Sequence, residues 1–502
     1  MSPAAMSKMT VKLLLPAFLC VLGQGLAAAE RPNILFAIAD DMSHAGAYGY
    51  KFLHTPHFDR VAKEGILFNR AYTPSSKCAP SRSVIITGRN PWQLEAAANH
   101  QPFFPGKFKS VVEELGEHGY FTGFTGKGWG PGVSGGRNLT GKDFSSLKVK
   151  KTPAGGINKI DYAGNFDLFL KDKPKEKPFF FWYGCKEPHR GYEFKSGVKS
   201  GKKLSDLDFL PSFWGGDEAI RHDILDYAVE VEYFDTHLGR ILKSIEAAGE
   251  LDNTLVIATS DNGMPFPRFK GHPYEHSMHM PLAAMWKNGI IKPGRQCNGF
   301  VSFIDYAPTL LEVARVTEKK NGMAAIQGKS LFDIFANKST GRDMLLTGRE
   351  RNDIGRPHDR GYPVRSLHQG QYVYMHNFEP DRWPCGNPET GYRDTDASPT
   401  KKATLVHKPG TPEYDKSYGK RPQQELYDLE KDPECVNNLA ATAEHDDLKE
   451  QMQATLFAEL KKQGDPRMHG RGEVFDAYPH SKRPGYYEKV MAAGKDKGKV
   501  RP

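Results

Sequence analysis

The run "NILFAIADD", from Asn33 to Asp41, decides the fold class. Its apolar residues stop at two aspartates, which is typical of a strand buried on both faces of a parallel sheet. Three further apolar runs of this kind occupy 120–127, 177–184 and 254–263. Helical patterns lie at 55–64, 108–118, 219–248 and 305–313. This alternation predicts an α/β fold, with a large, mainly parallel sheet sandwiched between helices.

Polar side chains gather where the predicted strands end. They are Asp40, Asp41, Lys127, His189, Asp261 and Asn262. In open α/β sheets, ligands bind at the carboxyl ends of the strands. We therefore expect these residues to lie close together and to form a binding site.

The character of the sequence changes after about residue 345. Residues 362–379 predict a hairpin, the segment "QELYDLEKDPE" another strand, and 446–463 an amphipathic helix. We therefore expect a main domain over 30–345 and a smaller α+β subdomain with an antiparallel sheet over 346–463. Residues 464–502 have too little apolar content to fold alone, and we expect an extended or flexible tail.

The N-terminus has the pattern of a secretory signal. Lys8 and Lys12 accompany an apolar run over 11–26, and small residues follow up to Ala29. The run contains Pro16 and is short for a membrane span, so we prefer a cleaved signal over 1–29 to a transmembrane anchor. The mature chain should be secreted or periplasmic, and lysosomal only if its source is an animal.

Composition excludes two classes of protein. The net charge of +9 comes from scattered basic residues, so we expect a solvated surface and no nucleic-acid partner. The mature chain retains an odd number of cysteines without a close pairing pattern, which argues against a disulfide scaffold. They are Cys78, Cys185, Cys297, Cys385 and Cys435.

The segment "SSKCAPSRSVIITGRNPWQ", over 75–93, holds one of these cysteines in an unusual setting. Pro80 favours the first turn of a helix, and a helix starting there places Cys78 and Arg82 one turn apart. A helix N-terminus favours an anion. A half-buried cysteine near a surface turn is the alternative, but it leaves the arginines unexplained.

The motifs "CAPSR" at 78–82 and "TGR" at 87–89 resemble the signature of the type I sulfatases, of the alkaline phosphatase superfamily. The resemblance extends over most of the mature chain. "DD" at 40–41 and "SDNG" at 260–263 match the metal-site elements of that family. The resemblance to this family implies a catalytic domain over 30–345.

The resemblance implies that Cys78 is oxidised to formylglycine. The partner for that step is a formylglycine-generating or anaerobic sulfatase-maturing enzyme. One hydroxyl of the hydrated aldehyde attacks sulfur, and the other then loses its proton and expels sulfate. A serine would need water to attack sulfur a second time.

Position 78 and the acidic elements imply a metal site. Asp40, Asp41, Asp261 and Asn262 offer only oxygen ligands, and Cys78 completes the set as the aldehyde hydrate. Calcium is the ion that the family implies, with Mg²⁺ second. The alternative, in which the aspartate pair only caps a loop, is less favoured because "SDNG" matches independently.

Cationic groups surround the expected sulfate. By resemblance, Arg82 steadies the hydrate, while Lys127 and Lys270 neutralise the sulfuryl group. His189, in "KEPHRGY", contacts sulfate or protonates the leaving group. Relatives carry a histidine where this chain has Trp129. Either another group, with His100 as the candidate, takes over its role in deprotonation, or the release step is slower.

The substrate is expected to be a sulfated oligo- or polysaccharide. Motifs including "TSDNGMPFP" at 259–267 and "EPHR" at 187–190 are similar to the heparan N-sulfatases, and bacterial sulfatases acting on ulvan are similar in the same stretches. Hence N-sulfated glucosamine is expected first and algal polysaccharide second. Arg365, His376 and Asn377 either reach the sugar or pack the two domains together.

Two other classes remain open. A phosphoesterase of the same superfamily would use a metal pair and a serine or threonine nucleophile. The chain lacks the additional aspartate and histidine ligands for that pair, and Cys78 would have no role. A glycan-binding protein without activity would retain the fold and an unmodified thiol.

Overall fold

A computed structural model describes residues 31–317 and 321–493. The predicted signal over 1–29 lies outside these residues. Among the described residues, no helix combines the length and apolar character that a bilayer crossing requires.

The large sheet has eight strands in the order β5-β4-β6-β1-β7-β8-β2-β9. All neighbouring strands pair in parallel except at β8, which runs against both β7 and β2. The bounds are β1 Asn33–Ala39, β2 Ile66–Phe68, β4 Phe121–Gly126, β5 Lys142–Asp143, β6 Phe179–Gly184, β7 Thr254–Ser260, β8 Leu282–Met285 and β9 Arg295–Cys297. The mainly parallel sheet and its four predicted strands are confirmed.

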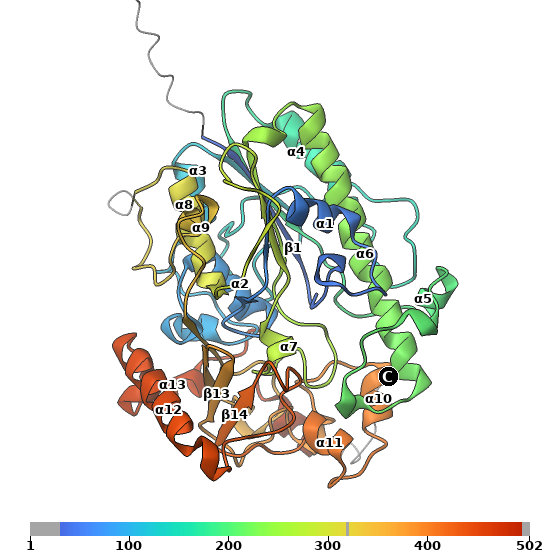
Figure 1. Cartoon of the computed structure of the whole chain (residues 1–502), viewed down its shortest axis with the longest axis vertical. Helices are drawn as coiled ribbons and strands as arrows, with labels where there is room; N and C mark the ends of the chain where they lie inside the picture. The colour runs from blue at the N-terminus through green and yellow to red at the C-terminus, as the bar shows by residue number, and fades with distance from the viewer. Residues whose placement is uncertain (1–30, 318–320, 494–502) are drawn as a thin grey trace, which may run out of the picture. The chain divides into compact units, whose positions relative to one another are not determined.

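Strand β1 shows why the sheet needs helices on both faces. Ile34, Phe36 and Ile38 pack into one apolar core, and the alternating residues Leu35 and Ala37 pack into the other. Helices α1 (Pro56–Lys63), α4 (Tyr162–Asp172) and α6 (Glu218–Ala247) cover the second core, and α2 (Cys78–Thr87), α3 (Val111–Glu117), α8 (Tyr306–Val313) and α9 (Phe332–Phe335) cover the first (Figure 1). The helical sandwich is confirmed.

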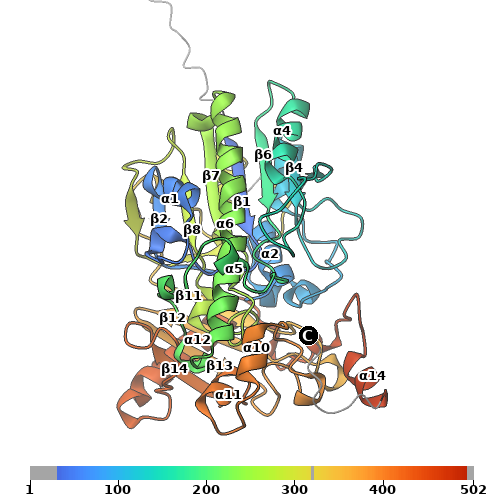
Figure 2. The ribbon, with the colours of Figure 1, turned by 90° about the vertical axis from the view of Figure 1, so that its right-hand side faces the viewer.

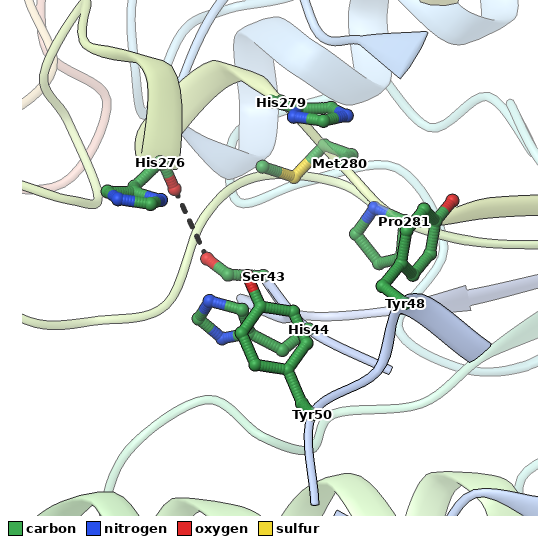
Figure 3. A pocket seen from close by; sticks show the side chains of 8 residues that line it. All are labelled: Ser43, His44, Tyr48, Tyr50, His276, His279, Met280 and Pro281. Atoms are coloured by element: carbon green, nitrogen blue, oxygen red, sulfur yellow. Dashed lines mark hydrogen bonds between the residues drawn. The ribbon is translucent and has the colours of Figure 1, made fainter. Parts of the chain in front are cut away.

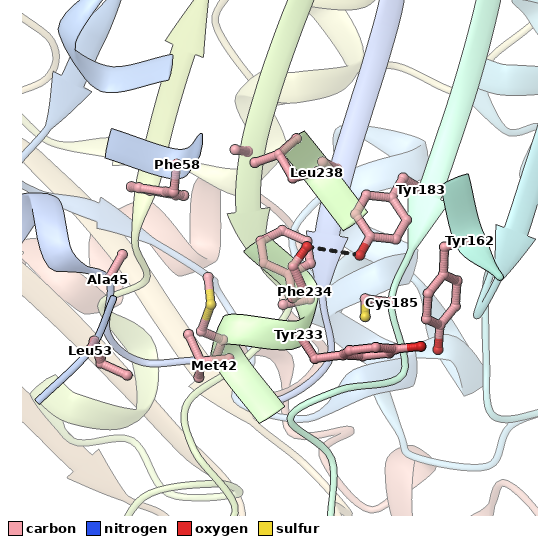
Figure 4. Close-up of a cluster of buried hydrophobic side chains, with 14 of the residues drawn as sticks. Met42, Ala45, Leu53, Phe58, Tyr162, Tyr183, Cys185, Tyr233, Phe234 and Leu238 are labelled. Carbon is pink, nitrogen blue, oxygen red and sulfur yellow. Dashed lines mark hydrogen bonds between the residues drawn. The ribbon is translucent and has the colours of Figure 1, made fainter. Parts of the chain in front are cut away.

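The second core includes aromatic side chains that tie α6 to the sheet. In Figure 4, the hydroxyl of Tyr183, in β6, donates a hydrogen bond of 3.0 Å to the carbonyl of Phe234, in α6. Tyr162 and Met42 lie close by in the same cluster. This packing fixes the positions of the segments that follow β1 and β6 at the carboxyl end of the sheet.

The smaller sheet is an antiparallel meander of four strands. They are β11 (Met344–Arg349), β12 (Val364–Gln369), β13 (Tyr372–Asn377) and β14 (Gln424–Asp428). Helix α12 (Asp446–Lys462) packs on it through Met452, Leu456 and Leu460. This sheet lies beyond the carboxyl end of β1 (Figures 1 and 2). The predicted subdomain is present, but its first strand crosses the predicted boundary at 345.

The extended or flexible tail predicted after Gln463 is wrong for residues 464–493. This segment contains α13 (Val474–Ala477) and α14 (Tyr486–Ala492). Phe475 is buried beside Trp92, and its carbonyl accepts a hydrogen bond of 2.8 Å from Asn99. The segment has few apolar residues of its own, but it packs on apolar side chains of the rest of the chain.

Candidate active site

The acidic residues that follow β1 and β7 meet at the end of the sheet. The two strands pair in register up to Ala39 and Ser260, so the next residues are neighbours. The amide of Asp41 donates to Oδ1 of Asp261 at 3.1 Å. Asp41 has φ of 75°, which ends the strand alternation and lets both aspartates face the same site.

Helix α2 brings the cysteine to these carboxylates. It begins at Cys78, two residues before the predicted start, and all ten of its residues are buried. The Sγ atom of Cys78 lies 3.3 Å from Oδ1 of Asp40 and 3.8 Å from Oδ1 of Asp41. One turn later, Arg82 donates to Asp261 at 2.7 Å. Thus Cys78 and Arg82 share the face that was predicted.

Two lysines neutralise the aspartate pair. The Nζ atom of Lys127 lies 2.5 Å from Asp40, and that of Lys270 lies 2.5 Å from Asp41. Burial raises the pKa of Asp40, but Lys127, His189 and Arg82 outweigh it and hold that pKa below its usual value. Both aspartates therefore have a cationic partner.

The position of Lys127 depends on a glycine. Gly126, at the end of β4, has φ of 80°, and a Cβ atom there would lie 2.2 Å from the carbonyl of Gly184. Only glycine fits this approach of two strand ends. The carbonyl of Lys127 then accepts from Nη1 of Arg82 at 2.8 Å. The backbone at 126–127 therefore positions Lys127 and also anchors the guanidinium group of Arg82.

His189 is the most exposed of the predicted catalytic residues. Its side chain is 43% exposed, and Nε2 lies 4.0 Å from Oδ2 of Asp41. Its Nδ1 atom lies 2.8 Å from the carbonyl of Arg190. The imidazole therefore stands where the site meets solvent, beyond the buried aspartates.

The predicted metal ligands are brought together. One ligand atom each of Asp40, Asp41, Cys78 and Asp261 lies within 4.8 Å of all the others, and all four residues are buried. The Oδ1 atom of Asn262 is buried and has no hydrogen-bond partner among the described residues. Three carboxylates this close repel one another, so a hard divalent cation fits this donor set.

The residue at the position of the missing histidine has a packing role. The indole of Trp129 donates to Oγ of Ser83 at 2.9 Å, and its ring packs edge-on against Phe104. His100 has a buried Nδ1 atom without a partner in the described part of the chain. Burial and the charges of Lys77 and Lys270 hold the pKa of His100 well below its usual value.

The hairpin residues Arg365, His376 and Asn377 pack the subdomain. Arg365 is 1% exposed and bonds Asp465 at 2.6 Å and Glu350 at 2.6 Å. Asn377 donates to Glu425 at 2.8 Å, and His376 packs edge-on against Phe457. Of the two alternatives, these contacts favour packing over contact with the sugar, because the polar groups are directed at residues of the subdomain.

The structure adds two charged residues that the sequence analysis missed. Asp396 lies 3.1 Å from Lys270, and Lys77 is buried immediately before Cys78. The position of Lys77 beside the motif was a signal that could have been used. Asp396 lies in an irregular segment without any recognisable pattern.

A separate cavity of about 200 Å³ adjoins the segment that follows Asp41. Figure 3 shows its lining, which consists mainly of imidazole and phenol side chains. The lining residues are Ser43, His44, Tyr48, Tyr50, His276, His279, Met280 and Pro281. None of the predicted site residues is among them, so this cavity is distinct from the cluster around Cys78.

Comparison with protein families identifies the chain. The profile of the sulfatase family matches residues 32–316, more than half of its length. The chain belongs to the sulfatase family. It is therefore a sulfuric ester hydrolase, as the motifs at 78–82 and 260–263 predicted.

Two relatives span most of this sulfatase. An ulvan-active sulfatase of Formosa agariphila is 28% identical over 453 residues, covering 89% of this chain and 83% of the relative. Human N-sulphoglucosamine sulphohydrolase is 28% identical over 461 residues, covering 83% of this chain and 87% of the relative. Both are enzymes of sulfated glycans by name, as expected for the substrate class.

Solved structures share the fold. A protein in complex with its substrate D-glucosamine-2-N,6-O-disulfate has a TM-score of 0.63 at 20% identity, covering 87% of this chain and 99% of that one. The phosphonate monoester hydrolase of Agrobacterium radiobacter has a TM-score of 0.63 at 18% identity, covering 88% and 97%. These likenesses confirm the alkaline phosphatase-like architecture.

Proposed function

We propose that this sulfatase is exported and removes sulfate from a sulfated glycan through formylglycine at position 78 and a bound divalent cation. One observation carries the proposal. The Sγ atom of Cys78 lies 3.3 Å from Asp40, and the aspartates gathered around it are paired with Arg82, Lys127 and Lys270. An anion of the size of sulfate would meet the nucleophile and these charges together.

The chemistry at position 78 favours the modified residue. The hydrated aldehyde supplies one hydroxyl that attacks sulfur and a second whose deprotonation releases sulfate. The other classes considered, a phosphoesterase and a glycan-binding protein without activity, are disfavoured by the family assignment. The maturation partner is a formylglycine-generating or anaerobic sulfatase-maturing enzyme.

The residues proposed to hold the cation are Asp40, Asp41, Asp261, Asn262 and position 78. Their donors are oxygens once the cysteine is modified, so Ca²⁺ is preferred and Mg²⁺ comes second. The chemistry supplied there by a bound divalent cation would be polarisation of a sulfate oxygen. Arg82 orients Asp261 and opposes the rise that burial causes in the pKa of that carboxyl. Lys127 and Lys270, which pair with Asp40 and Asp41, would be available for the other sulfate oxygens when the cation takes over these carboxylates.

The leaving group requires a proton. His189 is proposed as its donor, because its imidazole is partly exposed and lies 4.0 Å from Asp41, where the bond to sulfur would be broken. Trp129 cannot exchange a proton in this way, since its indole is a hydrogen-bond donor only. His100 is the proposed base for the release step.

The proposed substrate is a terminal N-sulfated glucosamine, with O-sulfated ulvan oligosaccharides as the alternative. Relatives with these two activities by name are equally similar, at 28% identity each. Sulfate release from N-sulfoglucosamine and from ulvan oligosaccharides, measured side by side, decides between them. Release from neither, with release from 4-nitrophenyl sulfate, would overturn both assignments.

Mass spectrometry of the tryptic peptide "CAPSR" tests the mechanism. Active protein from the native host, or made together with a maturing enzyme, should carry an aldehyde at position 78. Cys78→Ser and Cys78→Ala should abolish turnover, with far-UV circular dichroism unchanged. A fully active preparation that contains only the thiol would overturn the proposal.

A further inference from the structure

Lys77 is a cation without a partner among the described residues. Its residue is 2% exposed and directly precedes Cys78 at the start of α2. Its ammonium group makes no hydrogen bond or ion pair to any described residue, although other lysines of the site, such as Lys127, are paired. The side chain is enclosed, but its ammonium group is not among the fully buried atoms without a partner, so it reaches the solvent of the site, where a ligand can bind it.

Backbone hydrogen bonds gather four segments around Lys77. The amide of Gly271 donates to the carbonyl of Ser76 at 2.8 Å, and the side chain of Asn352 donates to the carbonyl of Gly271 at 2.8 Å. The amide of His100 donates to the carbonyl of Arg351 at 2.9 Å. These bonds bring residues 76–78, 99–100, 270–271 and 351–353 to one edge of the active site.

Three partly exposed residues occupy this edge beside Lys77: His100, Asp353 and Asp396. We call the four residues the rim. Asp353 accepts a hydrogen bond of 2.9 Å from the amide of Ile354, and no cation lies within ion-pair distance of it in the described part of the chain. The rim therefore holds an unpaired ammonium group and an unpaired carboxylate, which do not touch.

The electrostatics agree with this arrangement. Burial raises the pKa of Asp353, and the charge of Lys77 partly opposes it. Burial also raises the pKa of Asp396, but Lys270 and Lys77 outweigh it and lower that pKa well below its usual value. Lys77 is thus close enough to both carboxylates to influence them, yet bonds to neither.

We propose that Lys77 and Asp353 bind a free hydroxyl group of the sugar that carries the scissile sulfate. A hydroxyl can accept from an ammonium group and donate to a carboxylate at the same time, so it bridges a gap between the two. A second anion would meet Asp353 and Asp396 and be repelled. The rim thus selects a sugar with free hydroxyls next to the sulfate.

This inference rests on the proposed function, because it describes the specificity of the same site. It differs from a general attraction for sulfated glycans, since more sulfate on the ring should weaken binding. Truncation of Lys77 or Asp353 should therefore weaken binding of the sugar and leave the interactions of the sulfuryl group unchanged. A small aryl sulfate, which has no hydroxyl groups, separates the two contributions.

The test compares Lys77→Met and Asp353→Asn with the exposed controls Lys175→Met and Asp381→Asn. Rates are normalised to the aldehyde content at position 78, because Lys77 adjoins the modified residue. The substrates are 4-nitrophenyl sulfate and whichever monosulfated sugar the wild type cleaves faster, N-sulfoglucosamine or an ulvan oligosaccharide. A second sugar, with one further sulfate on the same ring, completes the panel.

For each rim variant, Lys77→Met and Asp353→Asn, we expect the fold-decrease in kcat/KM to be at least ten times larger on the monosulfated sugar than on the aryl sulfate. The decrease on the sugar should come mainly from a higher KM. Asp353→Asn should also narrow the preference for the monosulfated over the disulfated sugar at least threefold. Equal losses on sugar and aryl sulfate, or an unchanged preference in Asp353→Asn, would overturn the inference. Absence of hydrolysis by wild type on every substrate would instead refute the proposed function.

Discussion

The Nε atom of Arg82 lies 2.7 Å from Oδ2 of Asp261, and both side chains are completely buried. Removal of one partner of such a pair leaves an uncompensated charge, at a cost of about 3–5 kcal/mol. We expect Arg82→Ala to lower Tm and to abolish aryl sulfate hydrolysis. The exposed Arg471→Ala is the control. A variant that keeps the Tm of wild type would show that the pair does not stabilise the fold.

Asn262 should make the thermal stability of the protein depend on the bound cation. Its Oδ1 atom is buried without a partner among the described residues, and it is a proposed ligand. A cation that binds only the folded state raises stability with its concentration, by about 2.7 kcal/mol at one hundred times Kd. We expect Ca²⁺ to raise Tm in wild type and to raise it much less in Asn262→Ala.

The exposed Asn288→Ala is the control for the calcium titration and should respond like wild type. A preference for Mg²⁺ over Ca²⁺ at equal concentrations would reverse the proposed choice of ion. An identical calcium response in Asn262→Ala would remove this residue from the ligand set.

Arg365 should act on stability and not on substrate choice. It bonds both Asp465 and Glu350 in the interior of the subdomain. Arg365→Ala leaves these carboxylates without that partner, so we expect a loss of about 3–5 kcal/mol in urea unfolding. The ratio of KM values for the saccharide and the aryl sulfate should stay as in wild type. A selective rise of the saccharide KM would restore a role in recognition.

Glu230 makes stability depend on pH. It is 2% exposed in α6, and burial, with Glu187 and Asp226 nearby, raises its pKa from 4.5 to about 9. The folded state then binds more protons than the unfolded state between these values, so this contribution to stability falls as pH rises from 4.5 towards 9. We expect the decrease in Tm between pH 5.5 and pH 8 to be smaller for Glu230→Gln than for wild type.

The exposed Glu176→Gln is the matched control for the pH series. It should show the same change in Tm between pH 5.5 and 8 as wild type. Parallel Tm profiles for wild type and Glu230→Gln would indicate that Glu230 is ionised in the folded protein.

Much of the architecture and the centre of the site could be predicted from the sequence. Buried parallel strands read as continuous apolar runs, and β1 and β7 are such runs. The carboxyl ends of neighbouring parallel strands meet at one edge of a sheet, so the sequence alone predicts that Asp40, Asp41 and Asp261 lie together. Strand β2, with three residues, and strand β8, with the sequence "LAAM", are too short for a period to be recognised.

Residues whose role depends on distant partners could not be predicted. Arg365 lies on the predicted hairpin, but its partner Asp465 is 100 residues away in a segment expected to be a tail. Asp353 and Lys77 come together only through backbone bonds between loops. No periodicity or local motif records such contacts.

The complete burial of α2 restricts when the protein can be matured. Cys78 is 2% exposed, and every other residue of its helix is also inside the folded chain. A thiol buried in this way is out of reach of another protein in the folded chain, so we expect an oxidising enzyme to need this segment unfolded. On the proposed mechanism, the aldehyde is therefore installed during synthesis or export. We then expect protein that folds with the thiol unmodified to stay inactive, even when the maturing enzyme is added to the purified folded protein.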